Sequence, residues 1–231
     1  LIQYADYVWL AVRTDPDAPK HKGLSILLVP TDSPGFSWTP VPTMSGTTTS
    51  ATFYQDVRVP ATNLVGEEHQ GWKLITNQLN HERVALCSAA GVQHLLADVR
   101  RWAHDTHLPD GRRVIDQEWV QVHLARVHAK VELLKLINWK IAWGVKRGVG
   151  PQDASATKVF GTEFFTEAYR LFMEVLGQES TVQRDEPGSL LRSRVERMYR
   201  STLILTFGGG TNEVQRDIIA MVGLGMPRAP R

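Results

Sequence analysis

The fold is decided by the stretch Glu118–Val145, EWVQVHLARVHAKVELLKLINWKIAWGV. Its apolar residues recur at alternating spacings of four and three, and only Asn138 interrupts the repeat. Such a repeat places a continuous apolar stripe along one face of a helix, which is typical of the seam of a helical bundle. The members of this stripe are Val120, Leu124, Val127, Val131, Leu134, Asn138, Ile141 and Val145.

Three further long helices are predicted around this seam helix. Two of them are expected at about residues 154–176 and 191–206, and a short helix follows from Asn212. The third is expected from residue 70 to about 103, because an apolar stripe can be drawn through that segment. Long helices joined by short connections predict an antiparallel four-helix bundle. The stripe of the 70–103 helix contains Ile75, Leu79, Glu82, Leu86, Ala89 and Leu96.

The first 65 or so residues have β patterns instead. Two short apolar runs predict buried strands, and two alternating segments predict strands with one polar face. Pro60 is expected to end this region, because proline cannot donate a ladder hydrogen bond. The predicted fold class is therefore α+β, a partial β domain followed by a helical bundle. The expected strands are 7–12, 24–29, 36–39 and 53–59.

The composition restricts the possible partners. Of the 231 residues 42% are hydrophobic and 22% are charged, and the net charge is +2, which gives no reason to expect nucleic acid or an anionic membrane. No apolar run approaches the roughly 18 residues of a membrane span. The single Cys87 cannot form an internal disulfide, and its apolar surroundings predict packing rather than reactivity. A cytoplasmic protein is predicted, with further sequence upstream of Leu1.

The segment Phe207–Arg216, FGGGTNEVQR, places three glycines directly before a helix. Glycine permits φ > 0 and a close approach of a ligand to the main chain, and a helix start presents free N–H groups and the positive end of the dipole. The turn would suit an anion such as a pyrophosphate. The alternative, a plain connector between two packed helices, is the one that the motif alone favours.

Among ionisable residues, Glu82 is the best candidate for chemistry. It falls on an apolar stripe, where desolvation would raise its pKa and make it a proton acceptor near neutral pH. The pattern alone favours the alternative, a stripe-edge glutamate that reaches solvent or pairs with Arg83 or Lys73. His104 and His107 have the spacing of a metal pair, but no carboxylate or thiol cluster accompanies them, so a surface loop and no metal site are predicted.

Three motifs, in order along the chain, resemble the acyl-CoA dehydrogenase family. The first joins that family's middle β domain to its C-terminal bundle, and the resemblance covers the whole chain. It implies that residues 1–66 are the C-terminal part of the middle β domain and residues 67–231 the helical bundle domain, a fragment without the N-terminal half. The motifs are Phe53–Pro60 with Asn63–Glu67 and Gly71–Trp72, then Leu79–Arg83, then Gly208–Arg216.

The family reaction is FAD-dependent α,β-dehydrogenation of an acyl-CoA thioester, in which a glutamate removes the α proton and the β hydrogen leaves as hydride to flavin N5. In many members that glutamate directly precedes the Gly-Thr of the closing motif, where this chain has Gly209. In the isovaleryl and long-chain branch the base lies in a Leu-x-x-Glu-Arg setting, which Glu82 matches. The resemblance therefore implies Glu82 as the base, with Asn80 and Arg83 lining the CoA-thioester region.

The resemblance also implies a set of contacts to FAD. Two of them depart from the family pattern: the arginine that reaches the FAD pyrophosphate aligns with His107, and the usual Gly-Gly-x-Gly is Gly177-Gln178-Glu179-Ser180. The family shares each FAD across a dimer interface, so an oligomer through the bundle is expected, a dimer of dimers of identical or unlike chains. The implied FAD contacts are Gly209, Gly210, Thr211, Glu213, Glu174, Gly177 and His107.

Several readings of the function remain open within this resemblance. The chain is similar to the actinobacterial two-subunit dehydrogenases, including sterol-degrading ones, with electron-transfer flavoprotein as the electron acceptor. The substitutions at the pyrophosphate contacts motivate an alternative, a non-catalytic subunit that completes a partner's FAD site. An acyl-CoA oxidase or a flavin monooxygenase on the same fold is a further possibility. The identity of the acyl chain does not follow from the sequence.

Overall fold

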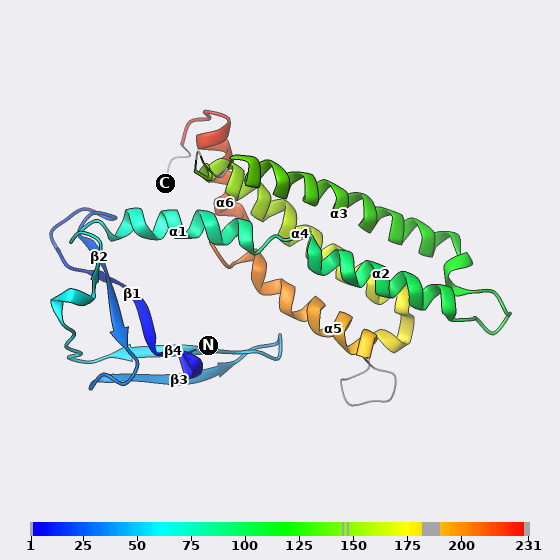
Figure 1. Ribbon diagram of the computed structural model, residues 1–231, viewed down its shortest axis with the longest axis horizontal. Helices are drawn as coiled ribbons and strands as arrows, with labels where there is room; N and C mark the ends of the chain where they lie inside the picture. Colours follow the sequence, from blue (N-terminus) through cyan, green and yellow to red (C-terminus); the bar gives the residue numbers. More distant parts are fainter. Residues whose placement is uncertain (1, 145, 147, 182–189, 229–231) are drawn as a thin grey trace. The chain divides into compact units, whose positions relative to one another are not determined.

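The computed structural model describes residues 2–144, 146, 148–181 and 190–228. The chain divides into two compact units, residues 1–79 and residues 80–231 (Figure 1). The predicted domain boundary after residue 66 stays a prediction. No helix within the described residues is both long enough and apolar enough to cross a membrane.

The first unit contains two small antiparallel sheets. In one sheet β2 (Leu24–Pro30) pairs with both β1 (Tyr7–Arg13) and β5 (Leu64–Val65), and in the other β3 (Phe36–Pro42) pairs with β4 (Thr48–Tyr54). Helix α1 (Gly71–Ala85) begins in this unit. Short 3₁₀ turns cover Ile2–Tyr4 and Ala61–Asn63.

Three expectations for the β region are wrong. The strand expected at 53–59 ends at Tyr54, because Asp56 adopts a left-handed conformation with φ of +52°. Pro60 does not end the β region, since β5 follows it. Strand β1 is not buried, because its side chains alternate between exposed and half-buried, whereas β2 does contribute buried residues such as Ile26.

The second unit is the predicted helical bundle. Its long helices are α2 (Ala90–Asp105), α3 (Glu118–Gly144), α4 (Pro151–Leu176) and α5 (Leu190–Thr202). Helix α4 contacts α2, α3, α5 and the short helix α6 (Asn212–Ile218), so it forms the centre of the unit (Figure 1). Short turns cover Val114–Asp116, Gly177–Thr181, Leu203–Thr206 and Ile219–Gly223.

The α3 stripe is the seam of the bundle, as the spacing predicts. Its first five members are buried and form one core with side chains of α2 and α4. Asn138 and Ile141 are half-buried, and Val145 lies outside the described residues. The buried members are Val120, Leu124, Val127, Val131 and Leu134.

A single helix over residues 70–103 is wrong, because the chain breaks between α1 and α2. The side chain of Asn138 satisfies two backbone groups at this break. Its Nδ2 donates to the carbonyl oxygen of Cys87 at 3.0 Å, and its Oδ1 accepts from the N–H of Ala89 at 3.3 Å. Cys87 is fully buried against Gly161, where an added Cβ would lie 2.7 Å from the sulfur. Burial raises the pKa of the Cys87 thiol to about 12, so this cysteine packs as a neutral thiol.

Other helix bounds differ slightly from those expected. Helix α4 begins at Pro151 rather than near residue 154, because proline is well suited to the first turn of a helix. Helix α5 ends at Thr202, and the remaining residues to Thr206 form a 3₁₀ turn instead. Part of the loop expected at 177–189 lies outside the described residues.

Replacing Asn138 tests whether the polar residue in the seam stabilises the helix break. Asn138→Leu would restore the apolar repeat but leave the backbone groups of Cys87 and Ala89 without their partner, so we expect a loss of about 1–3 kcal/mol in the free energy of unfolding. Chemical denaturation followed by circular dichroism measures this loss. Ile141→Leu, a volume-conserving change at the next seam position, is the control. A gain of stability in Asn138→Leu would show that the break does not depend on this side chain.

Candidate active site at the glycine turn

The glycine turn, residues 207–211, joins the 3₁₀ turn Leu203–Thr206 to α6. Gly209 and Gly210 have φ values of +71° and +100°, which residues with a Cβ rarely adopt. A Cβ on Gly210 would lie 2.6 Å from Nε2 of Gln215. Thr211 then caps α6 by accepting a hydrogen bond from the N–H of Val214 at 3.3 Å. The backbone of this turn therefore requires the glycines that the sequence places there.

A buried lysine holds the two ends of the glycine turn. Lys158 of α4 is 0% exposed, and its ammonium donates to the carbonyl oxygens of Thr206 at 3.0 Å and Gly210 at 2.7 Å. A third hydrogen bond goes to Oδ1 of Asn212 at 2.6 Å. All three donors of the ammonium are thus used. Burial lowers the pKa of Lys158 below its usual value.

Two further side chains hold the middle of the turn. Nε of Arg83 donates to the carbonyl oxygen of Gly209 at 2.8 Å, and Nε2 of Gln215 donates to the same oxygen at 3.3 Å. Gln215 is itself positioned by Ser155, whose hydroxyl donates to Oε1 at 2.9 Å. Nη1 of Arg83 donates to Oδ1 of Asn80 at 3.0 Å. The turn is therefore fixed from its inner side by residues of α1, α4 and α6.

The N–H groups of Gly209 and Thr211 donate to no acceptor among the residues that the structure describes. In a trans peptide the C=O and the following N–H point in opposite directions, and no described peptide bond is cis. Since the carbonyl of Gly210 faces Lys158, the N–H of Thr211 faces the other way. The turn thus combines carbonyls held inward with free donors, an arrangement that suits an electronegative ligand atom.

Glu82 lies beside the residue that anchors the glycine turn. It is half-buried near the end of α1, directly before Arg83. Burial lowers the pKa of Arg83, and the nearby Glu82 carboxylate opposes that decrease. Within residues 80–231 as described, the Glu82 carboxylate makes no hydrogen bond or salt bridge. The structure therefore brings Arg83, and Asn80 through it, into contact with the glycine turn, and Glu82 directly precedes Arg83 on α1.

The remaining expected cofactor residues lie elsewhere. Glu213 is on the first turn of α6, where its pKa is lowered chiefly by a hydrogen bond from its own backbone N–H. Glu174 lies near the far end of α4, sixteen residues and about 24 Å along the helix from Lys158, and Gly177 directly follows that helix. His107 is exposed just after α2, which ends at the same end of the bundle as α4 (Figure 1). The sequence-predicted cofactor residues thus fall into two separate groups.

At this far end the charged side chains are already paired. The Glu174 carboxylate accepts hydrogen bonds from Nε2 of His123 at 2.7 Å and from Nη1 of Arg170 at 2.5 Å. In the loop that contains His107, Arg112 is bound to Asp110 and Arg113 to Asp116, each at 2.7 Å. Gly177, which ends α4 with φ of +64°, has open space where a Cβ would be. Positive charge that could bind a pyrophosphate is therefore largely neutralised here.

The histidine pair is not part of a metal cluster in the described ranges. His104 contacts Asp105 and Arg113 through its two ring nitrogens, at 3.3 and 3.0 Å. No group of three or more His, Cys, Asp or Glu residues that could hold a metal ion occurs in the part of the chain that the structure describes.

A basic hollow in the first unit was not identified from the sequence. It has a volume of about 860 Å³, and its only acidic lining residue is Asp15. The ring of His21 stacks on Trp72 with 4.1 Å between ring centroids, which leaves a flat aromatic surface beside several cationic groups. The basic side chains around the hollow are Lys20, His21, Lys22, His69 and Lys73. The cluster of lysines in the turn after β1 is the signal that could have found it.

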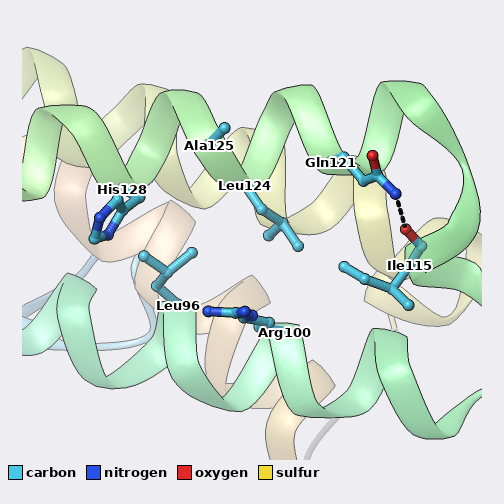
Figure 2. A pocket seen from close by; sticks show the side chains of 7 residues that line it. All are labelled: Leu96, Arg100, Ile115, Gln121, Leu124, Ala125 and His128. Carbon is cyan, nitrogen blue, oxygen red and sulfur yellow. Dashed lines mark hydrogen bonds between the residues drawn. The ribbon is translucent and has the colours of Figure 1, made fainter.

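A second hollow, of about 380 Å³, lies between α2 and α3 (Figure 2). Leu96 and Leu124 face one another across it, with Arg100 and His128 beside them. Gln121 closes one end by donating to the carbonyl oxygen of Ile115 at 3.0 Å. It contains none of the expected site residues, so it is a feature of the outer bundle surface.

Sequence reasoning also missed the residues that hold the turn from inside. Lys158 lies on the stripe of Ala154, Gly161 and Phe165, at spacings of four, three and four, and all of these residues are buried. A lysine in such a stripe must find oxygen partners, because a buried charge without them is very costly. The position of Lys158 in this stripe could therefore have identified it from the sequence. No sequence pattern indicated that Gln215, on the short helix α6, would be buried.

Comparison with known proteins supports one family. The model of the acyl-CoA dehydrogenase C-terminal domain matches residues 69–224. The acyl-CoA dehydrogenase FadE26 of Mycobacterium tuberculosis is 66% identical over 238 residues, covering 100% of this chain and 60% of FadE26. The chain therefore spans about three fifths of the length of this relative.

Two solved structures agree with this match. The ChsE4-ChsE5 complex from Mycobacterium tuberculosis contains a chain that is 67% identical with a TM-score of 0.91, covering 99% of this chain and 59% of that one. The Tcur3481-Tcur3483 steroid ACAD gives 46% identity and a TM-score of 0.91, with 99% and 58% covered. The fold is that of the small antiparallel β region and helical C-terminal domain of these proteins. This chain belongs to the acyl-CoA dehydrogenase family.

Proposed function

We propose that this chain is a catalytic subunit of an FAD-dependent acyl-CoA dehydrogenase in which Glu82 is the base. The observation that carries the proposal is the hydrogen bond from Nε of Arg83 to the carbonyl oxygen of Gly209 at 2.8 Å. It joins the helix segment that contains Glu82 to the glycine turn, which has no carboxylate of its own, and on this basis we assign the base to Glu82. The Glu82 carboxylate would take the α proton of the thioester.

The residues of the glycine turn fit the flavin end of FAD, the hydride acceptor for this chemistry when bound. Gly209 and Gly210 have no side chains that would keep a planar ring from the backbone. The free N–H groups of Gly209 and Thr211 would donate to oxygen atoms of the ligands, including a thioester oxygen on which negative charge develops. Asn80 and Arg83 would line the thioester region, and Glu213 would lie beside the cofactor.

The far end of the bundle fits a pyrophosphate less well, because its arginines are paired with carboxylates. This observation supports an assembly in which an unlike subunit supplies part of the FAD site, with Glu174, Gly177 and His107 contributing secondary contacts. It also favours the second candidate function, a non-catalytic subunit that completes the FAD site of its partner. The similar chains come from a ChsE4-ChsE5 complex and a Tcur3481-Tcur3483 steroid ACAD, and a steroid-derived acyl-CoA is the substrate class that we propose.

The base assignment is tested by Glu82→Gln in the full-length complex. We expect FAD to remain bound, because the amide keeps the shape of the side chain. Bleaching of the flavin absorbance by substrate should slow by about 10²–10⁴-fold, since the proton acceptor is lost. Glu67→Gln, a matched change at an exposed position of the first unit, should react normally. Normal bleaching in Glu82→Gln would exclude Glu82 as the base and favour the non-catalytic subunit.

The basic hollow of the first unit would bind the phosphates of CoA. Three lysines and two histidines surround it, and the stacked His21 and Trp72 rings offer a surface for a flat base. A phosphorylated nucleotide carries both of these groups, and CoA ends in one. We therefore propose that this hollow contributes to recognition of the nucleotide end of the substrate.

Reversing charge in the hollow tests this role. Lys20→Glu combined with Lys22→Glu should raise KM for the acyl-CoA by about tenfold or more, because several like charges then face the phosphates. The KM for the matching acyl-pantetheine, which has no nucleotide, should not change. Arg58→Glu, a single charge reversal at an exposed position of the same unit, is the control. An equal effect on both substrates would contradict a nucleotide site.

The outer face of α3 is the surface that we propose for oligomer assembly. Val122, Leu133, Leu136 and Trp143 lie on the side opposite the buried seam, and Leu136 and Trp143 are 58% and 89% exposed. A helix that is apolar on both sides is usually buried on both sides. The occupant that we propose is another subunit of the same fold, which would also cover the hollow between α2 and α3 (Figure 2).

A charge on this face should disturb assembly without affecting the fold. Leu136→Glu is expected to shift the full-length complex to a smaller assembly, because burial of a glutamate in an apolar interface is costly. Size-exclusion chromatography with light scattering measures the mass. Val41→Glu, the same kind of change on exposed β3, should leave it unaltered. An unchanged mass for Leu136→Glu would place the interface elsewhere.

A further inference from the structure

The ammonium of Lys158 is buried without a carboxylate partner. Its hydrogen-bond partners are two backbone carbonyls and one amide oxygen, and no salt bridge joins it to any residue in the described ranges. Glu163, the acidic residue of the same helix segment, instead binds Arg216 at 2.7 Å and Asn212 at 3.2 Å. The positive charge is therefore contacted directly by oxygen dipoles, while the carboxylates of Glu163 and Glu213 act on it only from a distance.

These contacts determine the orientation of one peptide group. The carbonyl of Gly210 is held by Lys158 at 2.7 Å, which fixes the plane of the Gly210–Thr211 peptide. The N–H of Thr211 points away from Lys158 and has no acceptor among the described residues. A cation at the carbonyl end also polarises the peptide, which strengthens its N–H as a donor. Glycine at position 210 could otherwise rotate between several conformations.

A neutral side chain could hold the same carbonyls at a lower cost of burial. Buried charges are destabilising relative to well-packed neutral groups in many proteins, and the Gly209 carbonyl of the same turn accepts from both the neutral amide of Gln215 and the guanidinium of Arg83. The charge of Lys158 is therefore costlier to bury than a neutral donor would be. Its effect falls on the Thr211 N–H, the donor at the opposite end of the peptide.

We propose that Lys158 is a positioning residue, whose ammonium orients and polarises the Gly210–Thr211 peptide so that the Thr211 N–H binds an acceptor atom of the bound flavin or thioester. This role rests on the proposed function. Lys158 itself touches neither ligand, and it acts through the peptide that it holds. This one role accounts for three observations: the unpaired N–H of Thr211, the positive φ of Gly210 and the three oxygen partners of the ammonium.

Lys158→Met in the full-length complex tests the proposal, because methionine keeps much of the length of lysine and removes its charge and donors. Hydrogen exchange measured by mass spectrometry should show faster exchange of the peptide spanning Gly208 to Asn212, with or without ligand. The kcat for substrate-dependent flavin reduction should fall by about tenfold to hundredfold with KM within about twofold, as expected for a misplaced transition-state donor. Lys158→Arg, which keeps the charge, should recover part of the loss.

Lys146→Met, which removes an exposed lysine beyond the end of α3, is the matched control and should resemble the wild type in every measurement. A Lys158→Met complex that is less heat-stable but has normal kcat and normal exchange at the turn would reduce Lys158 to a structural role and overturn the proposal. Absence of substrate-dependent flavin reduction in the wild type would instead contradict the proposed function. The exchange measurement would still report whether Lys158 orients the turn.

Asn212→Ala provides a second test should Lys158→Met fail to fold. It removes one of the three oxygens around the ammonium and keeps both carbonyl contacts. We expect the same pattern on a smaller scale, with faster exchange at the turn and a lower kcat at nearly constant KM. An unchanged kcat together with unchanged exchange would contradict the proposal.

Discussion

The buried ammonium of Lys158 is the constraint on which the candidate site depends. A charge that is fully removed from water must be surrounded by oxygen atoms, and here the glycine turn supplies them from both of its ends. The turn can do so only because Gly209 and Gly210 adopt positive φ values. The sequence of the turn and the lysine on the central helix α4 are therefore parts of one arrangement, although they are about fifty residues apart.

This arrangement also explains why the turn carries no carboxylate of its own. A Cβ at Gly209 would lie 3.2 Å from Cγ of Arg83 and would have to accept a left-handed backbone. Arg83 occupies that space in order to hold the Gly209 carbonyl. An acidic side chain is instead available one residue before Arg83, at Glu82. The packing of Arg83 thus disfavours a side chain at position 209, and the base that we propose comes from the residue before Arg83.

The bundle could be predicted because the α3 stripe is defined by the spacing of apolar residues within one helix. This spacing can be recognised without knowing which helices pack against it. The sequence did not predict the break between α1 and α2, since Leu86–Ala89 contains no glycine or proline and the break is stabilised by Asn138 from another helix. The end of β4 was also missed, because Asp56 adopts a left-handed conformation with φ of +52°, which the sequence pattern did not indicate. In the candidate site, the motif predicted Glu82 and the glycines. Lys158 was not predicted, because its role depends on the oxygen atoms that surround it, and these come from residues about fifty positions later in the chain.

The two ends of helix α4 differ in how many polar groups are free to bind a ligand. At its first turns, Ser155 and Lys158 hold a turn whose inner contacts are satisfied and whose outer donors are free. At its last turn, Glu174 is engaged by His123 and Arg170, and the nearby loop arginines are paired with aspartates. One end is thus prepared for a ligand, and the other has little charge left for one. The pairing of these described arginines supports our proposal that a second subunit contributes to the phosphate contacts of the cofactor.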